Sequence, residues 1–138
     1  MLFRFCAIAA CFLALTAFSD EQKAKLATAC ADSLVKGKER GRPIPAALVD
    51  NRVVICTCIG DQVAKDTTIP DAEKPKITSV FTLSAAGKSK EALALRRSLN
   101  LAVNTAMRKF TRSCSREFMK PAKKGDAKKP VKKGAKPE

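Results

Sequence analysis

Four cysteines are the residues of this chain best suited to chemistry. Cys56 and Cys58 are separated only by Thr57, while Cys30 and Cys114 lie far from them on either side. Two neighbouring thiols near the start of a helix can exchange disulfides when their pKa is lowered, so a thiol-disulfide oxidoreductase is one hypothesis. Redox folds usually carry Cys-x-x-Cys between a strand and a helix, which this spacing does not match. We therefore favour structural disulfides.

The spacing of the cysteines also limits how they can pair. A bridge between Cys56 and Cys58 would close a small, strained ring and would hold nothing distant together. On a helix, two positions correspond to a rotation of about 200°, so the two sulfurs point to nearly opposite sides. We expect one of them to bond to Cys30 and the other to Cys114. The segment that carries them would then be tied to another helix on each side.

Other catalytic and metal-binding arrangements have little support. Hydrolytic triads and most general-base designs need a histidine, and the sequence contains none. Zinc ordinarily needs a Cys-x-x-Cys knuckle or histidine partners. Two spaced carboxylate pairs, Asp61 with Asp66 and Asp71 with Glu73, lie in a polar stretch with lysines nearby, and we interpret them as solubilising charges. We predict no enzyme activity, no cofactor and no metal site.

Arginine recurs at helical spacing towards the C-terminal end of the chain. Arg108, Arg112 and Arg116 follow one another every four residues, and Arg97 precedes them by eleven, close to a whole number of turns. Like charges at this spacing destabilise an isolated helix by roughly a few tenths of a kcal/mol each, so helix stability does not explain the stripe. It is either the solvated face of an amphipathic helix or a surface that binds an anionic partner.

The final residues add a second source of positive charge. From Lys120 to Glu138 the chain is almost entirely lysine, alanine, proline and glycine, with a single larger aliphatic residue, Val131. Such a segment cannot bury enough apolar surface to offset its loss of conformational entropy, so we expect it to be disordered. The stripe and this tail together would bind an anionic partner. The residues assigned to this role are Arg97, Arg108, Arg112, Arg116, Lys123, Lys124, Lys128, Lys129, Lys132 and Lys133.

The first residues predict export. Arg4 precedes an apolar run from Phe5 to Phe18, and the chain turns polar at Ser19, which is the pattern of a secretory signal peptide. Ala17 and Ser19 are small residues at the spacing that signal peptidase recognises, so we expect cleavage after Ser19. The run is shorter than the roughly 20 residues of a membrane-spanning helix and no basic flank follows it. The mature protein would have no transmembrane span and would be periplasmic in a Gram-negative host, or otherwise secreted.

A lipoprotein box is the competing interpretation of this segment. Ile8-Ala9-Ala10-Cys11 resembles the site at which bacterial lipoproteins are cut and acylated, but it would leave the apolar residues 12–18 on the mature chain. Removal of residues 1–19 instead takes away Cys6 and Cys11 and leaves four cysteines. In an exported chain these imply two disulfides rather than a metal site.

Helical periodicity dominates residues 20–119, and no alternating strand with a hairpin turn is recognisable. We expect helices over about 20–36, from between 45 and 50 to about 65, over about 75–85 and over about 89–119. Gly37 is expected to end the first, and Ser89 to cap the last. The predicted core residues are Leu26, Cys30, Leu34, Val53, Val54, Ile55, Cys56, Ile59, Val63, Ile77, Val80, Phe81, Ala92, Leu95, Leu99, Ala102, Val103, Ala106, Phe110 and Cys114.

The predicted fold is therefore all-α, a small disulfide-stapled bundle of three to four helices with a disordered C-terminal tail. Its parts are a signal peptide (1–19), a helical domain (20–119) and a basic tail (120–138). The order Cys30, Cys56-Thr57-Cys58-Ile59, Cys114 resembles that of a loose set of small exported bacterial helical proteins of unknown function. The resemblance covers residues 26–116; it supports the architecture and implies no activity.

Charge and compartment together limit the class of partner. The abundant anionic surfaces outside the inner membrane of a Gram-negative cell are lipopolysaccharide, phospholipid head groups and the cell wall, and an acidic protein is a further candidate. Nucleic acid is less favoured because the chain is exported, lacks Trp and Tyr for stacking on bases and contains no recognisable reading module. The alternative function is a module for one specific protein partner, such as an inhibitor, immunity protein or chaperone.

Overall fold

The computed structural model describes residues 18–120, in which all regular secondary structure is helical. The helices are α1 (Asp20–Glu39), α2 (Ala46–Asp50), α3 (Arg52–Lys65), α4 (Lys74–Ala85), α5 (Ser89–Ser98) and α6 (Leu101–Ser115). The prediction of an all-α fold stapled by disulfides is confirmed. The expected signal peptide, apart from its last two residues, and the expected tail beyond Lys120 lie outside the described residues. None of the helices in residues 18–120 is both long and apolar enough to cross a membrane.

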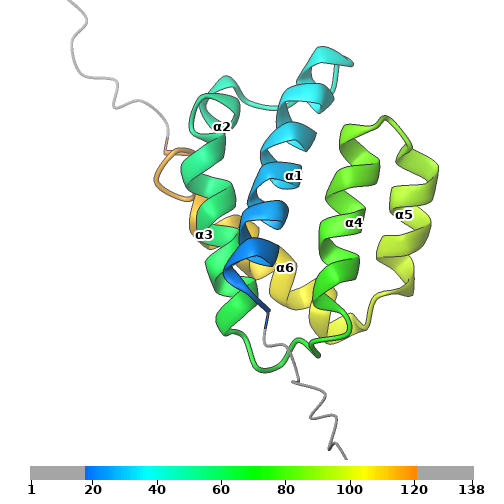
Figure 1. Ribbon diagram of the computed structural model, residues 1–138. Coiled ribbons are helices and arrows are strands. Elements are labelled where there is room, and N and C mark those ends of the chain that lie inside the picture. Colours follow the sequence, from blue (N-terminus) through cyan, green and yellow to red (C-terminus); the bar gives the residue numbers. More distant parts are fainter. Residues whose placement is uncertain (1–17, 121–138) are drawn as a thin grey trace, which may run out of the picture.

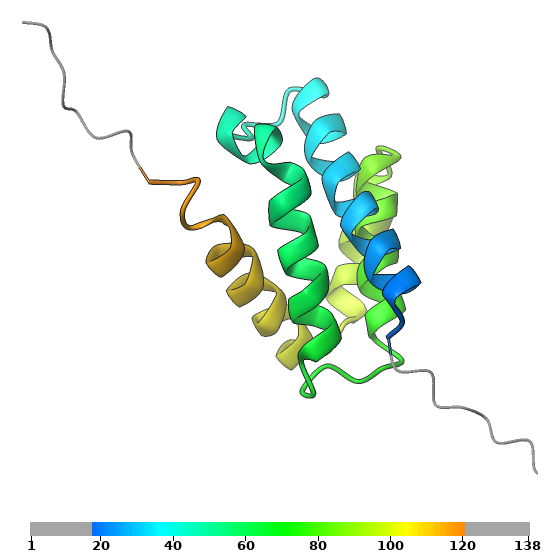
Figure 2. The same cartoon turned by 60° about the vertical axis from the view of Figure 1, so that its left-hand side comes forward.

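Helix α1 lies at the centre of the bundle. It packs against α3 on one side and α4 on the other, and α5 covers the outer side of α4 (Figure 1). Helix α6 packs chiefly against α3 and crosses behind α1 and α4 in this view, whereas the rotated view shows α6 and α3 side by side (Figure 2). The largest fully buried side chains come from α1, α3, α4, α6 and the segment between α3 and α4. They are Leu26, Cys56, Val63, Ile69, Ile77 and Val103.

A glycine permits the close approach of α1 and α3. Gly60 is buried in α3, and a Cβ atom at this position would lie 3.3 Å from the backbone oxygen of Lys23 in α1. Any larger residue would have to push the two helix backbones apart. The contact also lies one turn beyond Cys56, so the disulfide and the glycine bring the same two helices together.

Two of the predicted helices are each divided in two, and asparagines stand at both divisions. Asn51 ends α2 and begins α3, and its side-chain amide donates to the carbonyl of Ala47 at 2.9 Å. Asn100 caps α6, where its side-chain oxygen accepts from the amide of Ala102 at 3.0 Å. Asparagine side chains compete with helical backbone bonds, which explains why a continuous apolar periodicity does not produce a continuous helix.

The helix ends differ from the expected ones in further details. Helix α1 continues through Gly37, which is buried against the side chain of Ile44, to Glu39; the glycine with positive φ that follows this helix is Gly41, at +77°. Ser89 is the first residue of α5 and provides no side-chain cap. Helix α6 ends at Ser115 rather than near residue 119.

Most of the predicted core is buried or borders the core, but part of α3 is not. Ile55, Cys56, Ile59 and Val63 are buried, whereas Val53 and Val54 are 65% and 58% exposed. The prediction was wrong for these two valines because the neighbours of α3 cover only part of its circumference. Ala102 of α6 is also exposed.

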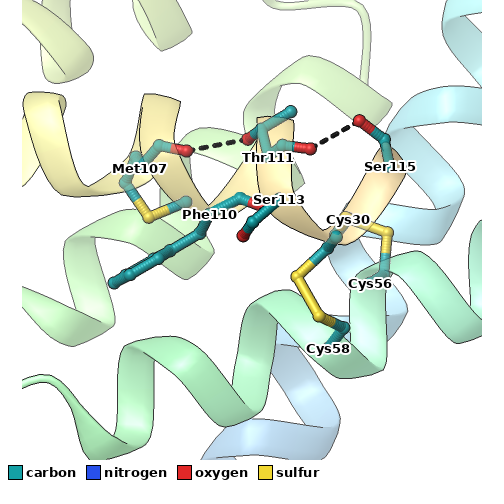
Figure 3. The surroundings of a disulfide bond; sticks show 9 residues. Cys30, Cys56, Cys58, Met107, Phe110, Thr111, Ser113 and Ser115 are labelled. Carbon is teal, nitrogen blue, oxygen red and sulfur yellow. Dashed lines mark hydrogen bonds between the residues drawn. A yellow bond between two sulfur atoms is a disulfide. The ribbon is translucent and has the colours of Figure 1, made fainter. Parts of the chain in front are cut away.

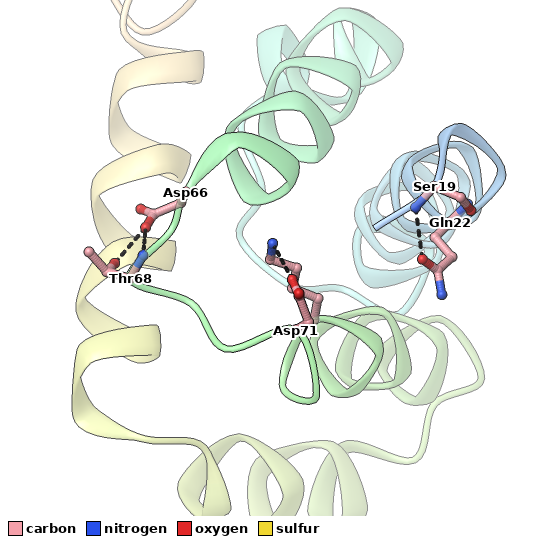
Figure 4. Close-up of polar contacts among 6 residues, drawn as sticks. Ser19, Gln22, Asp66, Thr68 and Asp71 are labelled. Atoms are coloured by element: carbon pink, nitrogen blue, oxygen red, sulfur yellow. Dashed lines mark hydrogen bonds and ion pairs between the residues drawn. The ribbon is translucent and has the colours of Figure 1, made fainter. Parts of the chain in front are cut away.

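The N-terminus of α1 has a complete capping box. The Oγ of Ser19 accepts from the amide of Gln22 at 3.2 Å, and the side-chain oxygen of Gln22 accepts from the amide of Ser19 at 2.9 Å (Figure 4). Phe18 packs against the hydrophobic core. Cleavage after Ser19, as expected from the sequence, would remove Phe18 and Ser19 from the mature protein.

This arrangement predicts that a chain beginning at Phe18 is more stable than one beginning at Asp20. Loss of the cap alone should cost about 1 kcal/mol, and loss of the Phe18 packing adds to it. Urea unfolding of the chains 18–138 and 20–138 measures the difference. Ser19→Ala in the longer chain should reproduce the capping part, whereas Ser19→Asp should retain it. Equal stability of the two chains would contradict the assignment.

A second capped turn lies between α3 and α4. Oδ1 of Asp66 accepts from the backbone amide of Thr68 at 2.7 Å and also from its hydroxyl (Figure 4). The hydroxyl bond is the main reason why the pKa of Asp66 lies below its ordinary value of 3.8. The turn directs the buried Ile69 into the core. Further along this segment, Asp71 and Glu73 form ion pairs with Lys74 and Lys76, respectively, rather than a catalytic pair.

The Asp66 turn predicts a pH dependence of stability. Because its pKa is depressed in the folded state, Asp66 stabilises the fold fully above the unfolded value of 3.8, and this contribution disappears as the pH falls through the folded pKa. The difference in unfolding free energy between wild type and Asp66→Asn should be constant above about pH 5 and shrink below about pH 4. Thr68→Val, which removes the hydroxyl donor, should behave in the same way. A difference that persists unchanged to pH 2 would exclude this mechanism.

Candidate anion-binding site

Two disulfides hold α3 between α1 and α6. Cys56 is bonded to Cys30 of α1, with 5.7 Å between their Cα atoms, and Cys58 is bonded to Cys114 of α6, with 5.9 Å between theirs. Figure 3 shows α3 in green between the blue α1 and the yellow end of α6. The prediction that the two central cysteines bond outward in different directions is confirmed, and the structure assigns each its partner.

Both bridges close long loops. In the chain-entropy description, sequence separations of 26 and 56 residues correspond to about 3.5 and about 4 kcal/mol of stabilisation. The second bridge joins the end of α6 to the bundle. It therefore restrains the helix that carries Arg108 and Arg112, and Arg116 directly after its end.

The two disulfides differ in accessibility. Cys30 and Cys56 are 2% and 0% exposed, respectively, so their bridge is part of the core. Cys58 is half-buried, and with Cys114 it lines a small surface pocket that Arg116 also borders. The Cys58–Cys114 bridge is the one that a thiol reagent in solvent can approach.

The arginines of α6 and of its C-cap are divided between two surfaces. Arg108 and Arg112 are exposed and line a groove of about 620 Å³ on one side of the bundle, whereas Arg116 borders the pocket beside Cys114. Arg97 does not continue the stripe, because the chain turns at Leu99 and Asn100 and leaves Arg97 on α5. The sequence prediction was wrong on this point, since it assumed one uninterrupted helix.

Two further arginines complete the groove. Arg96, at the end of α5, and Arg42, in the loop between α1 and α2, line it together with Arg108 and Arg112. Sequence periodicity could not associate all four arginines, because they come from three separate segments: a loop, α5 and α6. The basic composition of residues 37–45 was the only feature of the sequence that could have indicated Arg42 as a binding residue. We call these four residues the arginine ring.

The arginine ring has no internal countercharge. Within residues 18–120 every ion pair uses a lysine, and none uses an arginine. No Asp or Glu of this part of the chain lines the groove. Two other arginines do have fixed partners: Arg40 donates to the carbonyls of Ser84 and Ala85 at the end of α4, and Arg52 donates to that of Val49.

Asparagine bonding determines where α5 ends and α6 begins, and hence the position of Arg96 relative to Arg108. The side-chain amide of Asn104 donates to the carbonyls of Arg96 at 3.1 Å and Leu99 at 3.2 Å. These bonds satisfy carbonyls that the end of α5 leaves without helical partners. The turn at Leu99 and Asn100 thus brings the last turn of α5 close to the start of α6.

Comparison with known proteins adds nothing to this geometry. No protein-family model, curated protein or solved structure matches the chain. The function therefore has to be inferred from the groove and its charges. The six tail lysines that were assigned to binding, between Lys123 and Lys133, lie outside the described residues.

The unequal burial of the bridges predicts an order of reduction. With limiting dithiothreitol under native conditions, Cys58–Cys114 should open before Cys30–Cys56, because attack needs access to sulfur. Alkylation followed by peptide mass spectrometry identifies the free thiols of the first intermediate. Preferential appearance of free Cys30 and Cys56 would show that local burial does not control the reaction.

Proposed function

We propose that this protein is an exported, non-enzymatic binding protein that associates with an anionic surface of the cell envelope. The arginine ring is its contact site, and the basic tail increases the attraction at longer range. The observation that carries the proposal is the convergence of four arginines, from α5, α6 and a loop, on one groove without any described carboxylate among its lining residues.

The chemistry of arginine supports this function. A guanidinium group remains charged, is weakly hydrated and presents a planar set of donors that matches phosphate and carboxylate oxygens. The four guanidinium groups form no ion pair within residues 18–120 and repel one another, and an anionic ligand removes that repulsion. Because the Asn104 bonds and the Cys58–Cys114 bridge restrain the supporting helices, little ordering entropy would be lost on binding.

The proposed partner is a phosphate-bearing lipid of the cell envelope rather than nucleic acid. Two disulfides are consistent with an oxidising compartment outside the cytoplasm, where lipid head groups are abundant. Within residues 18–120 no phenylalanine is fully exposed, which gives little support to stacking on bases.

Vesicle co-sedimentation tests this function. The oxidised chain 18–138 should bind phosphatidylglycerol vesicles and not phosphatidylcholine vesicles, and raising NaCl from 50 to 500 mM should weaken binding steeply because charge contacts are screened. Arg108→Gln/Arg112→Gln should lower affinity at least about tenfold. The charge-matched control, Arg97→Gln/Arg116→Gln, should lower it much less.

Two results would contradict the proposal. Salt-insensitive binding would exclude an electrostatic contact, and equal losses in the two double variants would show that the net charge matters and the ring does not. An acidic protein recovered in a salt-labile complex, with no vesicle binding, would assign the ring to a protein partner instead.

A further inference from the structure

We propose that the groove beneath the arginine ring holds the acyl chain of a single-chain anionic phospholipid, a lysophospholipid, whose phosphate lies at the arginines. This inference rests on the proposed function and adds the chemical class of the ligand. It requires two properties of one site: an apolar interior of suitable size and a positively charged rim.

The interior of the groove is apolar. Five side chains that border the core, and that remain only half-buried, line it from four helices: Leu34, Leu48, Val80, Phe81 and Met107. The buried Ile77 and Leu99 also contribute to its lining. These side chains leave apolar surface in contact with water, and an acyl chain would cover it.

Three polar side chains of the lining, those of Ser33, Asn104 and Thr111, use their donors within the protein. The hydroxyl of Ser33 donates to the carbonyl of Cys30 at 2.8 Å, and that of Thr111 donates to the carbonyl of Met107 at 2.8 Å. The Asn104 amide is bonded at the α5–α6 corner. Because these donors are satisfied within the protein, the lining beneath the arginines is suited to methylene groups.

The size of the groove fits one small ligand. Its volume of about 620 Å³ falls inside the range of about 300 to 1,000 Å³ that is typical of small-molecule sites. Helix α6 packs chiefly against α3, and side chains of α4 and α6 both line the groove. Loop residues Arg42, Pro43, Ile44 and Pro45 also line the groove.

The positive charge of the arginine ring favours a ligand with an anionic head group. An uncharged chain would leave four guanidinium groups uncompensated, and a bare anion would leave the apolar interior hydrated. A lysophospholipid with a net negative head satisfies both, because its phosphate accepts hydrogen bonds from the guanidinium groups. A lysophosphatidylcholine with an acyl chain of the same length brings the choline cation towards the arginine ring and should bind less tightly.

Isothermal titration calorimetry of the oxidised chain 18–138 with 1-myristoyl lysophosphatidylglycerol, below its critical micelle concentration, tests the ligand. We expect a 1:1 complex and at least tenfold weaker binding of the lysophosphatidylcholine with the same chain. Shortening the chain by two carbons should weaken binding about fifteenfold, since each methylene contributes roughly fourfold. Glycerol 3-phosphate should show no binding at these concentrations.

A pair of valine variants separates the groove from the charged surface. Val80→Trp places a bulky side chain in the groove and leaves every arginine in place, so it should lower lysolipid affinity at least tenfold while phosphatidylglycerol vesicle binding is unchanged. Val53→Trp makes the same change at an exposed site on α3 and should alter neither. Circular dichroism melting of both variants shows whether the fold is retained.

Several outcomes would overturn the inference. Vesicle binding without a 1:1 lysolipid complex would refute the groove site and leave the proposed function standing, whereas loss of both would refute the two together. Equal affinity for the choline lipid, or unchanged affinity in a folded Val80→Trp, would also refute it. If a glutamate-rich peptide bound the groove more tightly than the lysolipid, or if a dimer occluded it in sedimentation, the groove would belong to a peptide or to a second copy.

Discussion

The position of α3 between two covalent bonds is the constraint on which the rest of the structure depends. Cys56 and Cys58 are two residues apart on one helix, so their bonds leave in nearly opposite directions and hold α1 on one side and α6 on the other. Gly60 lets α1 approach closely on the same helix. With those relations fixed, α4 can pack on the free side of α1, and the groove remains between α4 and α6.

The proposed binding site follows from an interruption in secondary structure rather than from a motif. If residues 89–115 formed one straight helix, Arg96 would lie about 18 Å from Arg108 along the axis. The turn at Leu99 and Asn100 changes the direction of the chain, so α5 packs on α4, and Asn104 bonds the last turn of α5 to the start of α6 with two hydrogen bonds. The arginine ring is therefore a product of tertiary structure, since its members come from three segments.

This origin explains what could and could not be predicted from the sequence. Helical periodicity and the Cys-x-Cys spacing were sufficient for the all-α fold and for the outward pairing, because both are local consequences of helix geometry. The same periodicity continues through Asn51 and Asn100, so the breaks were missed although asparagine favours caps over helix interiors. Arg108 and Arg112 could be found by counting along one helix, whereas Arg42 and Arg96 required knowledge of how the chain turns back.

The unequal loop lengths of the two disulfides impose an order on oxidation in a chain that crosses a membrane from its N-terminus. In the proposed export, Cys30 and Cys56 would emerge 26 residues apart, whereas Cys58 would wait for a partner 56 residues further along. During that interval the thiols of Cys56 and Cys58 compete for Cys30. A bond between Cys30 and Cys58 would join α1 to the face of α3 that packs against α6. Efficient maturation therefore requires that α3 be helical before Cys30 is oxidised, or that an isomerase correct the pairing once Cys114 has emerged.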